Sequence, residues 1–120
     1  MERKMNGQMG VPSIKSLFEP TCFPRQESPE LCEVLIQGNN CRVERIVSTG
    51  QTTPAEQWYD QEQDEWVALL TGHAELTWAD GSTTPLNPGD WLLIPAHVRH
   101  RVNYTSTEPA CVWVAFYFSR

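Results

Sequence analysis

Two residues, Glu65 and His100, have the types and positions needed for metal binding or proton transfer. Glu65 opens an apolar run that closes at Gly72, and His100 follows a second apolar run that starts after Gly89 and is ended by Pro95. Such runs are typical of buried strands, and a strand end is a rigid place from which to present a carboxylate or an imidazole. We therefore take Glu65 and His100 as candidate catalytic residues and candidate metal ligands.

Alternation along both strands predicts that the two side chains point into one interior. Residues two apart in a strand share a face, so Glu65 lies with Val67 and Leu69, and His100 lies with Val102. Each polar group then stands on an apolar floor, which is typical of a ligand pocket.

Arg45 and two aromatic residues are candidate ligand-binding residues of the same pocket. By alternation Arg45 could reach into the interior and pair with Glu65 or with a ligand carboxylate; otherwise it is a surface arginine. Trp58 and Tyr59 could stack on a ligand at the pocket mouth, or pack in the core or in an interface.

A carboxylate inside an apolar barrel is costly when it is unpaired, which leaves three outcomes for Glu65. It binds a metal together with His100, or it pairs directly with His100 or Arg45. In the third outcome it is protonated, with a raised pKa, and serves as an acid or a base.

The elements that position these residues are short strands separated by Gly- and Pro-containing turns, which indicates an all-β protein. Residues 1–26 form an N-terminal arm, and 27–120 form a single domain with its core over 41–118. A short helix is expected over 28–37, with Ser28 as its N-cap and Gly38 at its end. The predicted strands are 42–48, 56–59, 65–70, 74–78, 83–86, 91–94, 99–104 and 111–118.

Two segments resemble the paired motifs of the cupin superfamily. In the second motif Gly89, Pro95 and His100 match, and His97 stands where the family has a glycine. In the first motif Glu65 and Gly72 match at the right separation. The slots of the family's His-x-His pair hold Tyr59 and Gln61 with a three-residue spacer, or Trp58 and Asp60 with a four-residue spacer.

The resemblance implies a double-stranded β-helix, or jelly-roll barrel, that is usually dimeric and has a pocket in its mouth. Family members with all four ligands hold Fe, Mn, Ni or Zn. Of those ligands only Glu65 and His100 carry over to this chain. Asp60 and His97 could complete a set of two imidazoles and two carboxylates for a weakly held divalent metal.

Three functions are compatible with these observations. The first is a cupin barrel that binds a small polar organic ligand. The second is a metal-dependent oxygenase, isomerase or lyase acting on a small organic acid or a sugar derivative. The third is a structural homodimer with a vestigial pocket.

Composition narrows the partners and the compartment. The net charge of −6 argues against nucleic acid or an anionic membrane as the main partner. No apolar run approaches the roughly 20 residues that span a bilayer, and the first seven residues lack the apolar core of a signal peptide. We expect a cytoplasmic protein whose four cysteines are free thiols, with Cys111 packed in the core.

Overall fold

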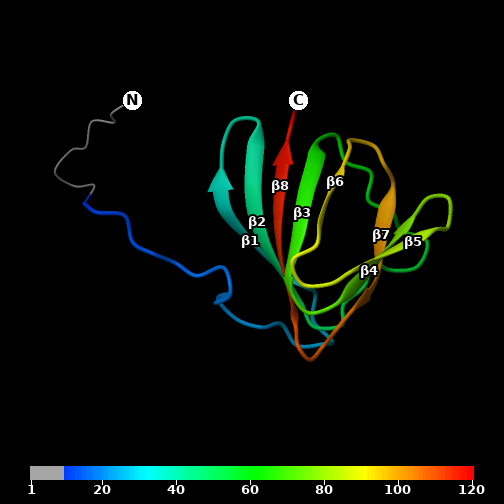
Figure 1. Cartoon of the computed structure of the whole chain (residues 1–120), viewed down its shortest axis with the longest axis horizontal. Helices are drawn as coiled ribbons and strands as arrows, with labels where there is room; N and C mark the ends of the chain where they lie inside the picture. The colour runs from blue at the N-terminus through cyan, green and yellow to red at the C-terminus, as the bar shows by residue number, and fades with distance from the viewer. Residues whose placement is uncertain (1–9) are drawn as a thin grey trace.

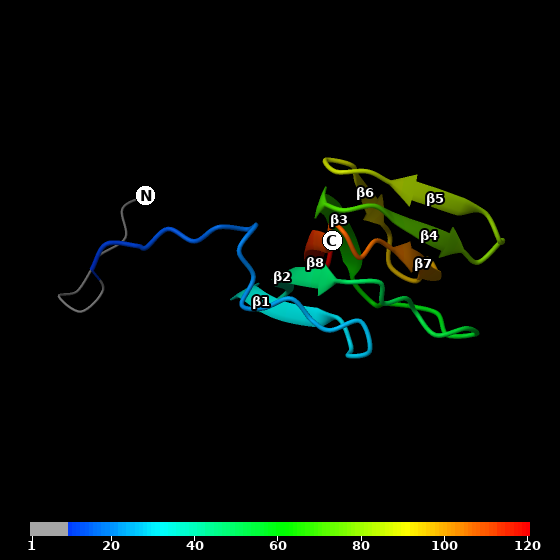
Figure 2. The same ribbon diagram turned by 90° about the horizontal axis from the view of Figure 1, so that it is seen from below.

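Two antiparallel sheets face each other in the computed structural model, which describes residues 10–120 (Figures 1 and 2). The larger sheet has the strand order β1-β2-β8-β3-β6, and the smaller has the order β5-β4-β7. The predicted all-β jelly-roll architecture is confirmed. The strands are β1 (Leu31–Gln37), β2 (Cys41–Ser48), β3 (Asp64–Thr71), β4 (Ala74–Trp78), β5 (Thr83–Leu86), β6 (Trp91–Ile94), β7 (His100–Thr105) and β8 (Cys111–Phe118).

Strand β8 is the centre of the larger sheet. It pairs with β3 on one side and with β2 on the other. Along β2 the register begins with Cys41 opposite Phe118 and ends with Ser48 opposite Cys111. Its apolar, β-branched and aromatic residues suit a strand that is covered on both faces. The core between the sheets therefore gathers around β8, with Leu69, Leu76, Leu86, Cys111, Trp113 and Ala115 among its buried residues.

The predicted helix over 28–37 is wrong, because this segment forms β1 at the edge of the larger sheet. Leu31, Val34 and Leu35 have helical spacing, but Val34 and Leu35 are exposed rather than packed on one face. The segment instead pairs with β2 through its backbone, with Leu31 opposite Val47 and Gln37 opposite Arg42. This pairing outweighs the weak helical pattern of the sequence. The predicted strand over 56–59 is likewise reduced to an isolated bridge between Tyr59 and His100.

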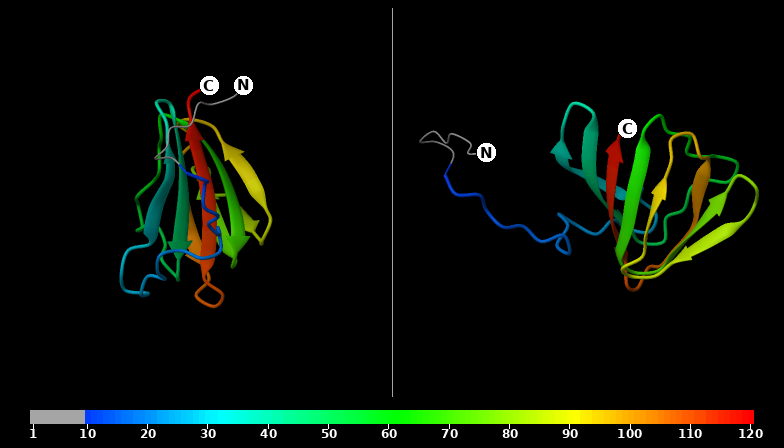
Figure 3. Two further views of the ribbon diagram at one scale, coloured as in Figure 1. Left: turned by 90° about the vertical axis from the view of Figure 1, so that its left-hand side faces the viewer. Right: turned by 45° about the horizontal axis from the view of Figure 1, so that its top comes forward.

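The N-terminal segment from 10 to 30 has no regular secondary structure, and its first part leads away from both sheets (Figure 3). Its later part is tied down by side chains of β2 and the loop after it. The Arg45 Nη1 donates to the carbonyl of Ser16 (2.8 Å), and the Thr49 hydroxyl donates to that of Pro24 (2.7 Å). Residues 1–9 of the predicted arm lie outside the described residues.

Two further expectations concern the cysteines and membrane spans. Cys22, Cys32, Cys41 and Cys111 are free thiols, and Cys111 is fully buried, as predicted. Within residues 10–120 no helix has the length and apolar character needed to cross a membrane.

The turn at Gly72 generates a stability prediction with a matched control. Gly72 and Gly81 both have a positive φ (83° and 89°), but only at Gly72 would an added Cβ lie 2.8 Å from the carbonyl oxygen of Ala110. We expect Gly81→Ala to cost about 1 kcal/mol from backbone strain alone. Gly72→Ala should cost about 2 kcal/mol more through the clash, as measured by urea unfolding. Equal costs for the two variants would contradict this packing.

Candidate functional site

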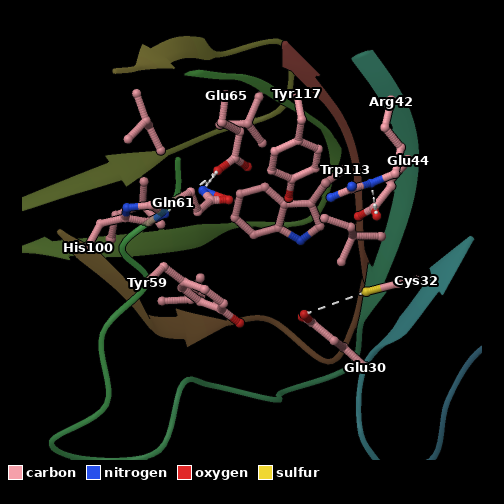
Figure 4. A pocket seen from close by; sticks show the side chains of 15 residues that line it. Glu30, Cys32, Arg42, Glu44, Tyr59, Gln61, Glu65, His100, Trp113 and Tyr117 are labelled. Carbon is pink, nitrogen blue, oxygen red and sulfur yellow. Dashed lines mark hydrogen bonds and ion pairs between the residues drawn. The ribbon is translucent and has the colours of Figure 1, made fainter. Parts of the chain in front are cut away.

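A cavity of about 290 Å³ lies between the two sheets and joins an apolar floor to a polar wall (Figure 4). Both sheets and the 57–61 segment contribute side chains to it. The lining residues are Glu30, Cys32, Arg42, Glu44, Ile46, Tyr59, Gln61, Glu65, Val67, Leu76, Ile94, His100, Val102, Trp113 and Tyr117.

The structure brings the two central candidates, Glu65 and His100, together on the cavity wall. Glu65 is near the start of β3, where it pairs with Ile94 of β6 and with Tyr117 of β8. His100 begins β7, and its backbone exchanges two hydrogen bonds with Tyr59 (2.8 and 3.2 Å). The Tyr59 ring also stacks on the imidazole, with 5.5 Å between ring centroids. Two sheet registers and one bridge thus fix both side chains.

The orientation of both groups follows from their hydrogen bonds. The His100 Nδ1 lies 2.9 Å from the carbonyl oxygen of Val98, which can only accept, so Nδ1 carries the proton. The Nε2 atom then faces Glu65, 3.7 Å from its Oε1. Gln61 donates its amide N–H to the same Oε1 at 2.8 Å. Because 3.7 Å is too long for a hydrogen bond, the imidazole and the carboxyl both keep hydrogen-bonding capacity toward the cavity.

Burial dominates the protonation of this pair. It raises the pKa of Glu65 to about 7, with a further rise from the negative charge of Glu44 and opposing effects from Tyr117, Gln61 and Arg42. Burial lowers the pKa of His100, because the charged imidazolium loses hydration. Near neutral pH, Glu65 can therefore gain or lose a proton beside a neutral imidazole, which is what general acid–base chemistry requires.

The cavity also contains ionisable residues that the sequence analysis missed. Arg42 donates through Nε to Glu44 (2.6 Å), and its guanidinium lies 4.6 Å above the centre of the Tyr117 ring. Burial raises the pKa of Glu30 and raises that of Cys32 to about 11, so this thiol stays protonated at neutral pH. Alternation in β2 could have found Arg42 and Glu44, but apolar residues on both faces of that strand hide which face is inward.

Arg45 does not reach into the barrel, and the prediction that it does is wrong. Its Nε donates to Glu33 Oε1 (2.8 Å) and its Nη2 to Glu33 Oε2 (3.2 Å), while Nη1 reaches the carbonyl of Ser16. Arg42 and Glu44 face the cavity, so Arg45 is on the opposite face of β2, beneath the N-terminal segment. The bidentate pair with Glu33 satisfies the buried guanidinium there.

The two aromatic candidates are placed differently. Tyr59 lines the cavity beside His100, where its ring can contact a ligand. Trp58 is not among the lining residues. Its ring packs instead against two arginines, and the ring centroid lies 5.3 Å from the Arg99 Cζ and 6.0 Å from the Arg101 Cζ. The prediction of Trp58 in the pocket mouth is therefore corrected.

The four predicted metal ligands do not come together. Asp60 and His97 pair with each other through Oδ1 and Nδ1 (2.8 Å), their side chains are 48% and 66% exposed, and neither lines the cavity with Glu65 and His100. In the part of the chain that the structure describes, no three His, Cys, Asp or Glu side chains are grouped to hold a metal ion. The donor set therefore does not fit Fe, Mn, Ni or Zn, which need more imidazole or carboxylate ligands than one of each.

Comparison with known proteins adds a family and two similar structures. The model of the family described as cupin domain matches residues 44–117. A crystal structure from Ralstonia eutropha JMP134, provisionally named a mannose-6-phosphate isomerase, is 36% identical, covers 91% of this chain and 100% of its own, and superposes with a TM-score of 0.82. A cupin superfamily protein from Desulfitobacterium hafniense DCB-2 is 19% identical, covers 82% and 84%, and has a TM-score of 0.69, which supports the fold alone. A search of curated proteins found no match.

The raised pKa of Glu65 predicts how Glu65→Gln changes stability with pH. Protonated Glu65 favours the folded state, and this contribution is lost as pH rises from the ordinary value of 4.5 through about 7. Glu65→Gln removes the cost of burying the charge. We therefore expect the variant to exceed the native chain in unfolding free energy by up to about 3 kcal/mol near pH 8 and to differ little near pH 4, below the ordinary pKa of 4.5.

Urea unfolding at the two pH values measures this difference. Glu62→Gln, which removes an exposed carboxylate just before β3, is the matched control for the loss of one charge. A parallel pH dependence for Glu65→Gln and the native chain would contradict the assigned environment.

Proposed function

The chain belongs to the cupin domain family, and on this premise we propose that it binds a small polar organic molecule in the cavity between its sheets. The observation that carries the proposal is the buried Glu65–His100 pair, whose facing atoms are left open to the cavity. The neutral imidazole of His100 offers Nε2 to a ligand as a hydrogen-bond acceptor, while the carboxyl of Glu65 can accept a hydrogen bond or, when protonated, donate one.

The rest of the cavity supports a ligand of this kind. Val67, Ile94 and Val102 are among its apolar lining residues, while charged and polar side chains, Glu65 and His100 included, line the rest of it. This combination is typical of sites for small organic molecules, in which apolar contact supplies affinity and a few polar groups fix the orientation. The volume of about 290 Å³ suits a metabolite-sized ligand rather than a polymer.

Cupin domains often bind divalent metals, but the function proposed here does not use one. Glu65 and His100 are the only members of the predicted ligand set on the cavity wall, and Gln61 and Tyr59 accompany them there. A neutral amide and a phenol are poor ligands for Fe, Mn, Ni or Zn. We assign Glu65 and His100 to ligand contact and proton transfer.

A second candidate function is the isomerisation of a sugar derivative, which the 36% identical structure named as a mannose-6-phosphate isomerase favours. Aldose–ketose isomerisation moves a proton between neighbouring carbons, with a base accepting it from one and an acid protonating the carbonyl oxygen. Glu65 beside His100 could perform these transfers. The charge of a sugar phosphate is a weaker match, because Arg42 is the one arginine among the cavity-lining residues and already pairs with Glu44.

One titration tests both candidates. The native chain, Glu65→Gln and His100→Ala are titrated with D-mannose, mannose 6-phosphate, lactate and lactamide, and backbone and imidazole NMR shifts are followed. We expect at least one probe to shift cavity-lining resonances saturably, and both variants to weaken its binding about tenfold, the effect of losing one hydrogen bond to a charged or strongly polar group.

The same samples with mannose 6-phosphate report formation of fructose 6-phosphate. Turnover that is lost in both variants and unchanged by a chelator would favour the isomerase. Ser82→Asp, in the exposed turn between β4 and β5 and outside the cavity lining, is the control variant. Failure of all four probes to shift any cavity-lining resonance would contradict the proposed function.

We also propose that the chain forms a homodimer through its N-terminal segment and the outer face of the larger sheet. Val11 and Ile14 are 93% and 98% exposed on the segment that leads away from the sheets. Trp91, Leu93 and Phe116 are exposed on the outer face of that sheet. A second copy of the chain would bury both apolar surfaces, which isolated monomers seldom expose together.

The segment gives a clean test of this assembly. Because Ile14 is 98% exposed, Ile14→Asp leaves the fold of one chain intact but places a charge in the proposed contact. We expect light scattering to give twice the chain mass of 13.7 kDa for the native protein and the single mass for the variant. Ser82→Asp, which adds a charge to the exposed turn between β4 and β5 and outside this contact, should remain dimeric, and a monomeric native protein would refute the proposal.

A further inference from the structure

An unpaired indole N–H in the cavity wall is the starting observation. Trp113 of β8 lines the cavity and is 5% exposed, and its Nε1 is buried without a hydrogen-bond partner among residues 10–120. By contrast, the Nε1 of Trp78 donates to the Thr84 hydroxyl at 2.8 Å. Buried N–H groups are nearly always paired, so an unpaired one in a cavity wall marks a place where a ligand supplies an acceptor.

Arg42 supplies further donors to the same cavity. Its Nε donates to Glu44, but its two terminal amino groups make no hydrogen bond to the described residues. Figure 4 shows the guanidinium of Arg42 extending from β2 toward the cavity, on the side opposite His100. A guanidinium with free amino groups prefers planar oxyanions, because two N–H groups can meet two oxygens.

The charges around these donors select a monoanion. Glu44 already neutralises part of the Arg42 charge, and Glu30 and Glu65 face the same space. Burial raises the pKa of both Glu30 and Glu65, so these two groups bind protons more readily than exposed carboxyls do. Arg42 still has two amino groups to offer one carboxylate, whereas a phosphate dianion would bring a second charge, and no other arginine or lysine is among the residues that line the cavity.

We infer that the ligand of this cavity is a small carboxylic acid, whose carboxylate accepts hydrogen bonds from the Trp113 indole N–H and the Arg42 amino groups. This inference rests on the proposed function and names the class of its ligand. The Glu65–His100 pair is then left to contact the opposite end of the molecule, where a hydroxyl or carbonyl group would lie.

Lactate and lactamide test the inference, because they differ only in replacing a carboxylate by a neutral amide. The full chain should bind lactate at least about tenfold more tightly than lactamide in NMR titrations, and lactate should move the Trp113 indole proton downfield. Trp113→Phe and Arg42→Gln should each weaken lactate by about tenfold and change lactamide little. Trp91→Phe, the same substitution on an exposed residue of the outer face, should bind lactate as the native chain does.

Several outcomes would overturn the inference. These are equal affinity for lactate and lactamide, unchanged lactate affinity in Trp113→Phe, or tighter binding of mannose 6-phosphate than of lactate. If Trp113→Phe does not fold, the change in the Trp113 indole proton shift of the native chain on adding lactate tests the contact by itself, and no change would overturn the inference. Binding of lactamide or D-mannose without a preference for lactate would refute the carboxylate and leave the proposed function standing, whereas no binding of any probe would refute both.

Discussion

The backbone pairing of β8 with both β2 and β3 is the constraint on which fold and site depend. Since residues two apart share a face, this pairing turns Trp113, Ala115 and Tyr117 toward the smaller sheet in one fixed row. The rings of Trp113 and Tyr117 line the cavity, while Ala115 between them is fully buried in the core. The same register sets Glu65 beside Tyr117. The ladder that closes the core therefore also builds the cavity wall.

Burial in this wall governs the chemistry of its ionisable groups. Water is largely excluded from Glu65, so its charged form loses hydration and its pKa rises to about 7, while burial lowers the pKa of His100. Contacts offset only part of the cost, because Gln61 donates one hydrogen bond and the positive charge of Arg42 is shared with Glu44. The result is a cavity rich in protonated or neutral donors, which matches a ligand that brings oxygen acceptors.

Strand periodicity predicted that Glu65 and His100 point into one interior, because each shares its face with apolar residues two positions along the strand, and the cupin resemblance predicted the jelly-roll fold. Periodicity failed where a strand is covered on both faces and where the residues lie in a loop. In β2, the N-terminal segment covers the outer face, so Arg45 is buried away from the cavity and simple alternation chose the wrong side. For Asp60 and His97, spacing placed both near the motif, but the loop turns them toward each other at the surface. Loop direction depends on contacts that periodicity does not contain.

The 57–61 segment explains why the cavity wall holds fewer metal-ligating side chains than the resemblance to cupins implies. The resemblance to cupins predicts two imidazoles from this stretch, yet the structure delivers the Tyr59 ring and the Gln61 amide. An imidazole pair would add lone pairs for a cation, whereas Gln61 adds a donor that holds one oxygen of Glu65. That hydrogen bond orients the carboxyl without neutralising its charge. The distance of 3.7 Å between Glu65 Oε1 and His100 Nε2 is too long for a hydrogen bond between the two residues. At the two positions where the cupin resemblance implies imidazoles, this loop therefore places a ring that stacks on His100 and an amide that holds the carboxyl of Glu65.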